Sequence, residues 1–270
     1  MPEKAASSLP GSAHGKTPLE VASYAARAAG KILTQRLGQP NKTTVKGKRN
    51  LVTEADFLSE KRVMAILSEE YPDHGILSEE SGARDADREF VWIIDPLDGT
   101  NNYHFGIPYF CVNIALARHN EVVLGITYDP VRDELFHAVI GGGAYLNGRK
   151  IRVSGVASLG DASVGVDLGY NPEQAGNMLA DTVKLWPKIH CLRLLGSASL
   201  GLAYVACGRI SLYFHRFLYP WDIASGLLLV REAGGEVLTG SKIPAGINDR
   251  ALAASSRALL DEYFKALKQA

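Results

Sequence analysis

The chain has 270 residues, of which 46% are hydrophobic and 21% charged, a composition typical of one large globular domain or two closely packed ones. Its 29 Lys and Arg residues balance its 29 Asp and Glu residues. This neutrality gives no overall attraction to nucleic acid or to an anionic membrane, although a local basic patch around an anionic substrate is compatible with it.

The first segment, residues 1–16, is rich in Ala, Ser, Gly and Pro and lacks the apolar core of a secretory signal. We interpret it as a disordered tail. The sequence holds no apolar run of the length that a membrane span needs. The three cysteines are far apart in apolar stretches, which indicates buried free thiols in a reducing compartment. We therefore expect a cytoplasmic protein; the cysteines are Cys111, Cys191 and Cys207.

Two helices are predicted after the tail. The first begins at Thr17-Pro18-Leu19-Glu20, which carries a capping box and a proline suited to the first turn, and it should end at Leu37. The second should run from about Thr53 to Tyr71, where Pro72 stops it. Extended residues from about 43 to 52 connect the two. The predicted apolar face of the second helix comprises Phe57, Met64 and Leu67.

Short apolar runs with a strand-like composition follow as far as about residue 153. The first two end in acidic residues. The next two flank Arg118-His119-Asn120-Glu121 and predict an antiparallel hairpin, and Asn147-Gly148 predicts another tight turn. The predicted strands lie at about 75–78, 90–94, 109–117, 122–128, 135–140 and 144–151.

From about Ser154 strand-like pieces alternate with helical ones, a pattern typical of α/β structure. We therefore expect an N-terminal α+β subdomain over residues 17–153 and a C-terminal α/β subdomain over residues 154–270, stacked as alternating layers of helix and sheet. The helices of the second half are predicted at 172–186, 197–207 and 220–233, with a final helix that ends at Lys268.

The strongest chemical signal is the motif Asp-Pro-Leu-Asp-Gly-Thr after a buried strand. That strand delivers Asp95 at its end, and Pro96 is expected to turn the chain so that Asp98 comes beside it. Two carboxylates held close repel unless a cation lies between them, and their oxygens suit Mg²⁺. Gly99 and Thr100 then open a turn or helix whose backbone N–H groups can hold a phosphate. A plain surface turn is the alternative, but the apolar strand before the motif favours the functional site.

Three further acidic residues also fit purely structural roles. Glu79 follows another apolar run and fits a solvated strand end. Asp222 lies in the first turn of a predicted helix, where an acidic side chain complements the macrodipole. Asp56, beside Thr53, fits the start of a helix in the same way. Each is therefore a weak signal when taken alone.

Together, the order and spacing of these motifs resemble the inositol monophosphatase family of lithium-sensitive, magnesium-dependent phosphatases. The resemblance extends over nearly the whole chain from Leu19. It implies the layered α-β-α-β-α sandwich shared with fructose-1,6-bisphosphatase, and a homodimer. The segments that carry it are Gly75-x-x-x-Glu79-Glu80, 92–100 and Trp221-Asp222-x-Ala224-Ser225-Gly226, supported by Leu51-Val52-Thr53-x-x-Asp56, 143–148 and Glu232-Ala233-Gly234-Gly235.

The resemblance implies a metal site of two or three Mg²⁺ ions. Glu79, Asp95 and the carbonyl of Leu97 would bind the first ion. Asp95, Asp98 and Asp222 would bind the second, so that Asp95 bridges the two. One ion would activate a bound water and another would stabilise the leaving ester oxygen.

The remaining motif residues would handle the proton and the phosphate. Thr100 would hydrogen-bond the attacking water and pass its proton towards Asp56, with help from Glu79. The amides of Gly99 and Thr100 would hold the phosphoryl oxygens, beside Asp98. Attack would be in line, because positioning and electrostatics suffice for phosphoryl transfer.

Substrate selection is expected in the second half. Family members that prefer inositol usually carry a glutamate seven residues before the late metal aspartate, and here that position is His215. A histidine can still bind a hydroxyl, and Arg216 could meet a second anionic group; both side chains equally fit a solvent-facing strand end. Gly196-Ser197-Ala198 matches the substrate-side turn of the family. Lys46 fits either a loop lysine near the metals or a solvated charge.

The leading hypothesis is hydrolysis of inositol 1-phosphate or a similar phosphorylated polyol or sugar, with neither nucleic acid nor a membrane as partner. Fructose-1,6-bisphosphatase, histidinol-phosphate phosphatase and 3′-phosphoadenosine phosphatase activities are alternatives with the same metal chemistry. A regulatory binding protein with residual activity is an alternative of another class, because some bacterial relatives are associated with transcription complexes. The complete metal set favours an enzyme.

Overall fold

The computed structural model describes residues 9–39, 43–47 and 50–268, and gives only the backbone of residues 43–47 and 50. Residues 1–8 of the predicted tail and the side chain of Lys46 thus lie outside the described residues. Residues 9–16 pack against the C-terminal end of helix Glu54–Glu70. There the N–H of Ala13 donates to the Glu70 carbonyl (2.8 Å), and Lys16 pairs with the Glu70 carboxylate. Among the described residues, no helix is long and apolar enough to cross a membrane.

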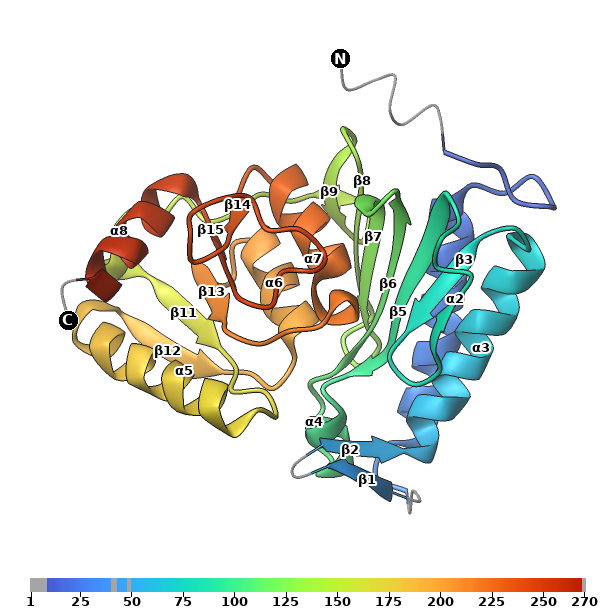
Figure 1. The fold of residues 1–270 in the computed structure, drawn as a ribbon, viewed down its shortest axis with the longest axis horizontal. Helices are drawn as coiled ribbons and strands as arrows, with labels where there is room; N and C mark the ends of the chain where they lie inside the picture. The colour runs from blue at the N-terminus through green and yellow to red at the C-terminus, as the bar shows by residue number, and fades with distance from the viewer. Residues whose placement is uncertain (1–8, 40–42, 48–49, 269–270) are drawn as a thin grey trace.

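Helices and sheets alternate in five layers (Figure 1). Two helices cover the outer face of a large sheet, two lie between this sheet and a smaller one, and two cover the outer face of the smaller sheet. The predicted α-β-α-β-α sandwich is therefore confirmed. The helices are, in that order, α2 (Pro18–Arg36) with α3 (Glu54–Glu70), α6 (Ala198–Ala206) with α7 (Pro220–Glu232), and α5 (Pro172–Leu185) with α8 (Arg257–Lys268).

The large sheet has eight strands in the order β10-β9-β8-β7-β6-β5-β3-β4. All neighbouring pairs are antiparallel except β3 and β5, which run parallel. The predicted hairpin turn is present, with positive φ at His119 and Asn120. The strands are β3 (Gly75–Ser78), β4 (Gly82–Arg84), β5 (Phe90–Asp98), β6 (Cys111–Arg118), β7 (Glu121–Asp129), β8 (Glu134–Val139), β9 (Gly143–Leu146) and β10 (Arg149–Lys150).

The smaller sheet has five strands in the order β12-β11-β13-β15-β14, with β11 parallel to both of its neighbours. Its strands are β11 (Ser163–Val166), β12 (Cys191–Leu194), β13 (Leu212–His215), β14 (Glu236–Leu238) and β15 (Leu252–Ser255). The remaining elements are the β1 (Thr43–Gly47) and β2 (Asn50–Thr53) hairpin, the short helix α4 (Thr100–His104) and two 3₁₀ turns, Leu159–Asp161 and Trp186–Lys188.

The middle helix layer joins the two halves through one core. Ile93 and Phe136 from the large sheet share a buried cluster with Leu227 from α7 and Ala254 from the smaller sheet. Gly125 permits the close approach of α7 to β7, since a Cβ there would lie 2.8 Å from the Cα of Ser225. The cavity described below forms where loops of both halves meet.

Helix α3 begins as predicted and packs differently from the prediction. Thr53 and Asp56 form a capping box in which the Asp56 carboxylate accepts from the Thr53 N–H (2.8 Å) and hydroxyl (2.6 Å). The predicted apolar face is wrong at Phe57, whose side chain is 49% exposed. The buried face instead includes Asp56, Glu60 and Val63. Its two acidic side chains have hydrogen-bond donors there: Thr53 and Thr100 for Asp56, and Ser78 and Ser81 for Glu60.

Candidate active site

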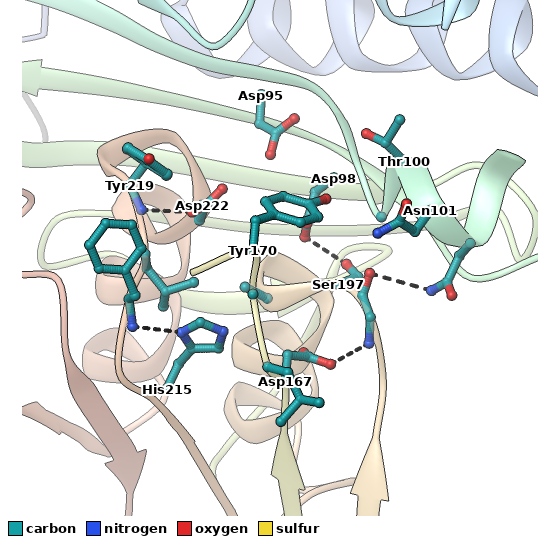
Figure 2. A pocket seen from close by; sticks show the side chains of 18 of the residues that line it. Asp95, Asp98, Thr100, Asn101, Asp167, Tyr170, Ser197, His215, Tyr219 and Asp222 are labelled. Atoms are coloured by element: carbon teal, nitrogen blue, oxygen red, sulfur yellow. Dashed lines mark hydrogen bonds between the residues drawn. The ribbon is translucent and has the colours of Figure 1, made fainter. Parts of the chain in front are cut away.

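One cavity of about 880 Å³ is lined by loops from both halves of the chain. The loops follow β3, β5, β11, β12 and β13, so strand ends of the two sheets contribute to the same walls (Figure 2). Eleven of the predicted site residues line it: Glu79, Asp95, Leu97, Asp98, Gly99, Thr100, Gly196, Ser197, Ala198, His215 and Asp222. Asp56 lies behind the wall, in contact with Thr100.

The Asp-Pro-Leu-Asp motif is not a turn that follows the strand. Strand β5 continues through Pro96 to Asp98, which corrects the prediction that Pro96 ends it. Asp95 pairs with Asn113 and Asp98 with Cys111. Between these two pairs, β5 advances by three residues while β6 advances by two. This one-residue bulge re-aims the chain. It brings both carboxylates to the cavity while the strand remains in the sheet.

Four acidic side chains therefore share one partly buried space. Burial, followed by the neighbouring charges of Glu79, Asp98 and Asp222, raises the pKa of Asp95 well above its ordinary value. Burial also raises the pKa of Asp98, and burial together with the Asp98 charge raises the pKa of Asp222 to about 8. The space thus favours added positive charge, either protons or cations.

The donor set fits a hard divalent cation, because carboxylate and carbonyl oxygens are the ligands that Mg²⁺ prefers. Within the described residues, however, no three His, Cys, Asp or Glu side chains have already converged into a metal-binding cluster. Glu79, Asp95, Asp98 and Asp222 instead line a common cavity.

Neutral donors hold two of these carboxylates in place. Asp98 accepts hydrogen bonds from the Ser197 hydroxyl (2.6 Å) and the Ser199 N–H (2.7 Å), at the start of α6. Asp222 accepts from the Tyr219 N–H (2.7 Å) at the start of α7. Because these donors are uncharged, they fix the side chains and leave the negative charge available.

A buried polar chain fixes the beginning of α7. The Thr127 hydroxyl donates to the Asn113 side-chain oxygen (2.9 Å) and contacts the Ser225 hydroxyl (2.6 Å). The Asn113 amide donates to the Trp221 carbonyl, and the Ser199 hydroxyl donates to the Asp222 carbonyl (2.9 Å). These contacts from β6, β7 and α6 set the position of Asp222.

Thr100 and Asp56 are in direct contact. The Thr100 hydroxyl lies 3.2 Å from Asp56 Oδ1 and 3.0 Å from the Leu97 carbonyl oxygen. Asp56 is almost fully buried, and burial raises its pKa to about 6. Thr100 begins α4, and Gly99 before it has φ 94°, where a Cβ would lie 3.0 Å from the Tyr109 carbonyl oxygen. The pair can therefore exchange a proton close to the carboxylates.

His215 is buried, which excludes the solvent-facing alternative for this residue. Its side chain is 3% exposed, its Nδ1 accepts from the Phe217 N–H (3.0 Å), and burial lowers its pKa to about 4. Arg216 instead pairs with Asp181 on α5 (Nε to Oδ2 2.6 Å) and is not among the described residues that line the cavity. This geometry does not support the hypothesis that Arg216 meets a second anionic group.

The cavity residues that the sequence analysis missed include Asp167 and Tyr170. Asp167 is buried and accepts from the N–H groups of Leu195 (2.9 Å) and Gly196 and from the Tyr213 hydroxyl (2.9 Å). Burial raises its pKa to about 7. It follows the apolar run 163–166 as Asp95 follows 90–94, and that signal could have found it. Tyr170, in the same loop, had no signal beyond its position.

The fold and the carboxylate-lined cavity define a phosphatase of the layered sandwich class. A family model described as "Inositol monophosphatase family" matches residues 16–270, and the chain belongs to that family, whose phosphatases depend on metal ions. An inositol-1-monophosphatase of Mesorhizobium japonicum is 42% identical over 223 residues, which cover 81% of this chain and 84% of that protein.

Two further relatives carry other names. The Nus factor SuhB of Escherichia coli K12 is 38% identical over 265 residues, covering 93% of this chain and 98% of that one. A crystal structure of the extragenic suppressor protein suhB from Bartonella henselae superposes with a TM-score of 0.89 at 35% identity, covering 93% of this chain and 98% of that one. Family membership therefore fixes the fold and the general chemistry but leaves the substrate undetermined.

The raised carboxyl pKa values predict a pH dependence for the metal-free protein. The pKa of Asp222 is about 8 in the folded chain against an ordinary 3.8, so the stability that its proton provides is complete below about pH 4 and is lost as the pH rises through 8. We expect the melting temperature in EDTA to fall between pH 5 and 8.5, and Mg²⁺ to raise it most at the higher pH. Thermal unfolding measured with and without Mg²⁺ checks this.

Asp222→Asn is the matched control for this measurement. It removes a titrating carboxyl and keeps the shape of the side chain, so it should flatten the pH dependence in EDTA. An equal Mg²⁺ effect at pH 5.5 and 8.5 would contradict the electrostatic account.

Proposed function

We propose that the chain hydrolyses a small phosphate monoester, with inositol 1-phosphate as the leading substrate, by in-line attack of a water activated by two or three Mg²⁺ ions. The observation that carries the proposal is the convergence of Glu79, Asp95, Asp98 and Asp222 on one cavity, with the Thr100–Asp56 hydrogen bond at its edge.

The acidic residues divide into ligands and a proton acceptor. Glu79, Asp95 and the Leu97 carbonyl would hold one ion, and Asp95, Asp98 and Asp222 a second. When bound, the ions lower the pKa of a water and neutralise charge on the phosphoryl and leaving oxygens. The fit of the ions rests on the oxygen-only donor set and on the burial and neighbouring negative charges that raise the pKa of Asp95.

Thr100 and Asp56 would remove the water's proton. The Thr100 hydroxyl, which donates to Asp56 Oδ1, would accept a hydrogen bond from the water and pass its proton towards Asp56, and Glu79 would assist. The pKa of Asp56, about 6, suits a base that works near neutral pH. The amides of Gly99 and Thr100, with Asp98 beside them, would orient the phosphoryl oxygens.

The substrate side would comprise Gly196, Ser197, Ala198 and His215, all of which line the cavity. A neutral histidine replaces the glutamate expected of strict inositol enzymes, so fructose bisphosphate, histidinol phosphate and 3′-phosphoadenosine compounds stay in the set to be tested. Phosphate release across this panel, with Mg²⁺ and with added lithium, ranks them. We also propose a homodimer, on the family resemblance alone.

A second candidate is a regulatory binding role. It rests on the relatives named Nus factor SuhB, at 38–40% identity. The complete set of four carboxylates favours catalysis, because a purely regulatory protein has no need of them. The two candidates separate experimentally, since a binding role would survive substitutions that abolish phosphate release.

Asp98→Asn should lower phosphate release about a hundredfold or more, because it removes charge needed to hold the cation and so forfeits several kcal/mol of transition-state stabilisation. Steady-state release from inositol 1-phosphate in saturating Mg²⁺ is the measurement. Asp73→Asn, an exposed acidic residue outside the cavity, is the matched control and should leave the rate unchanged. Wild-type turnover in the Asp98 variant would contradict the metal mechanism.

Thr100→Ala should lower the single-turnover rate about a hundredfold, since general acid–base groups contribute on that order. Thr100→Ser keeps a hydroxyl at the same position and should recover most of the rate. Mg²⁺ affinity, measured by calorimetry, should change little in either variant. Equal single-turnover rates for the Ala and Ser variants would remove Thr100 from the proton path.

A further inference from the structure

Tyr170 occupies the cavity and has no part in the mechanism above. It lies in the loop between β11 and α5, and its side chain is 37% exposed. Figure 2 shows its ring reaching across the cavity towards Asp98, between Asp222 on one side and Thr100 on the other. Tyr170 from the C-terminal half and the carboxylates of the N-terminal half thus line the same cavity.

The surroundings of the Tyr170 hydroxyl are acidic. Burial is the main cause that raises its pKa, and the charges of Glu79, Asp98, Asp222 and Asp95 add to it in that order. The phenol therefore keeps its proton near neutral pH and remains a hydrogen-bond donor. Tyr170 and the four carboxylates line one cavity. A phosphoryl group that contacts cations held by these carboxylates would therefore enter the cavity that this donor lines.

The loop that carries Tyr170 is fixed on its first side by Asp167. The Asp167 carboxylate accepts from the N–H groups of Leu195 and Gly196 and from the Tyr213 hydroxyl. These contacts tie the beginning of the loop to the Gly196 turn. The Gly196 turn is also bonded to α4, because the Asn102 side chain donates to the Leu195 carbonyl (2.9 Å).

The side chain of His215 packs against the loop at Gly169. Gly169 has φ +64°, and a Cβ at this position would lie 3.1 Å from His215 Cε1 and 3.5 Å from Nε2. Nδ1 of His215 already accepts the Phe217 N–H, so the neutral ring carries its proton on Nε2. The imidazole is therefore packed between the Phe217 backbone and Gly169, directly before Tyr170.

We propose that Tyr170 contacts the substrate, its hydroxyl donating a hydrogen bond to the phosphoryl group of the ester, and that His215 is a positioning residue that holds Tyr170 there through Gly169. The proposal rests on the phosphatase function proposed above. It places the role of His215 in supporting the loop, in contrast to the hydroxyl-binding role that the family glutamate suggests.

Inorganic phosphate, the common product, is the probe for the Tyr170 contact. Tyr170→Phe keeps the ring and removes the donor, so it should weaken phosphate binding in the presence of Mg²⁺ about tenfold, the order expected for one hydrogen bond to a charged group. The KM for each ester of the panel should rise by a similar factor, because the phosphoryl group is shared. Calorimetry with phosphate gives a readout that needs no turnover.

Tyr145→Phe is the matched control. Its hydroxyl donates to the Gly142 carbonyl, and Tyr145 is not among the described residues that line the cavity. Phosphate affinity should stay at the wild-type value in this variant. Equal phosphate affinity of wild type and Tyr170→Phe would overturn the proposed contact.

A double-mutant cycle tests the positioning role of His215. His215→Ala should weaken phosphate binding, and the loss should disappear when Tyr170 is already Phe, because both changes remove the same hydrogen bond. Losses that multiply in the double variant would mean that His215 acts independently of Tyr170. Melting temperatures of all variants separate general destabilisation from this coupling.

The failure of this proposal is distinguishable from failure of the proposed function. A wild-type protein that binds phosphate with Mg²⁺ but releases none from the panel would overturn the catalytic function and leave the Tyr170 contact to be judged by calorimetry. A wild-type protein that does not bind phosphate in Mg²⁺ would overturn both.

Discussion

The structure is organised around like charges that are buried together. Asp95 and Asp98 are held in the wall of one cavity with Glu79 and Asp222. Burial raises the pKa values of Asp95, Asp98 and Asp222, and the charges of neighbouring carboxylates add to the shift at Asp95 and Asp222. Such an arrangement costs stability unless protons or cations compensate it. The surrounding donors are hydroxyl and backbone N–H groups, such as those of Ser197 and Tyr219, so the protein orients the charge without cancelling it.

The layered fold makes this convergence possible. The bulge in β5 turns two carboxylates towards the cavity without ending the strand, and the middle helix layer brings Asp222 at the start of α7 to face them. Gly125 and the Asn113–Thr127–Ser225 chain set how closely α7 approaches the large sheet. Residues far apart in the sequence thus meet because the two sheets share one helix layer.

Much of this was accessible from the sequence. One capping box, helix-breaking prolines and apolar runs located the helices and most strands, since these signals are local. The metal and proton residues were predicted through motif order, and the structure brings all of them to one place, with Asp56 behind Thr100. Their assigned roles remain predictions. What failed depended on tertiary context: the course of β5 through Pro96, the exposed Phe57 and the partner of Arg216.

Asp167 and Tyr170 show a different limit of the sequence. Neither residue belongs to a sequence motif that indicates a catalytic or binding role. Their positions follow from the packing of Gly169 on His215 and from the hydrogen bonds of the Gly196 turn. Substrate-side residues lie on loops whose conformation is set by long-range contacts, so local pattern gives little information about them.

The central claim is that the buried carboxylates hold divalent cations at the expense of protons. Calorimetric titration of the metal-free protein with Mg²⁺ at pH 7, in two buffers of different ionisation enthalpy, measures the protons released on binding. The account predicts saturable binding with net proton release, because Asp222 and the carboxyl groups coupled to it are partly protonated at that pH. No binding, or binding with no proton release, would contradict it.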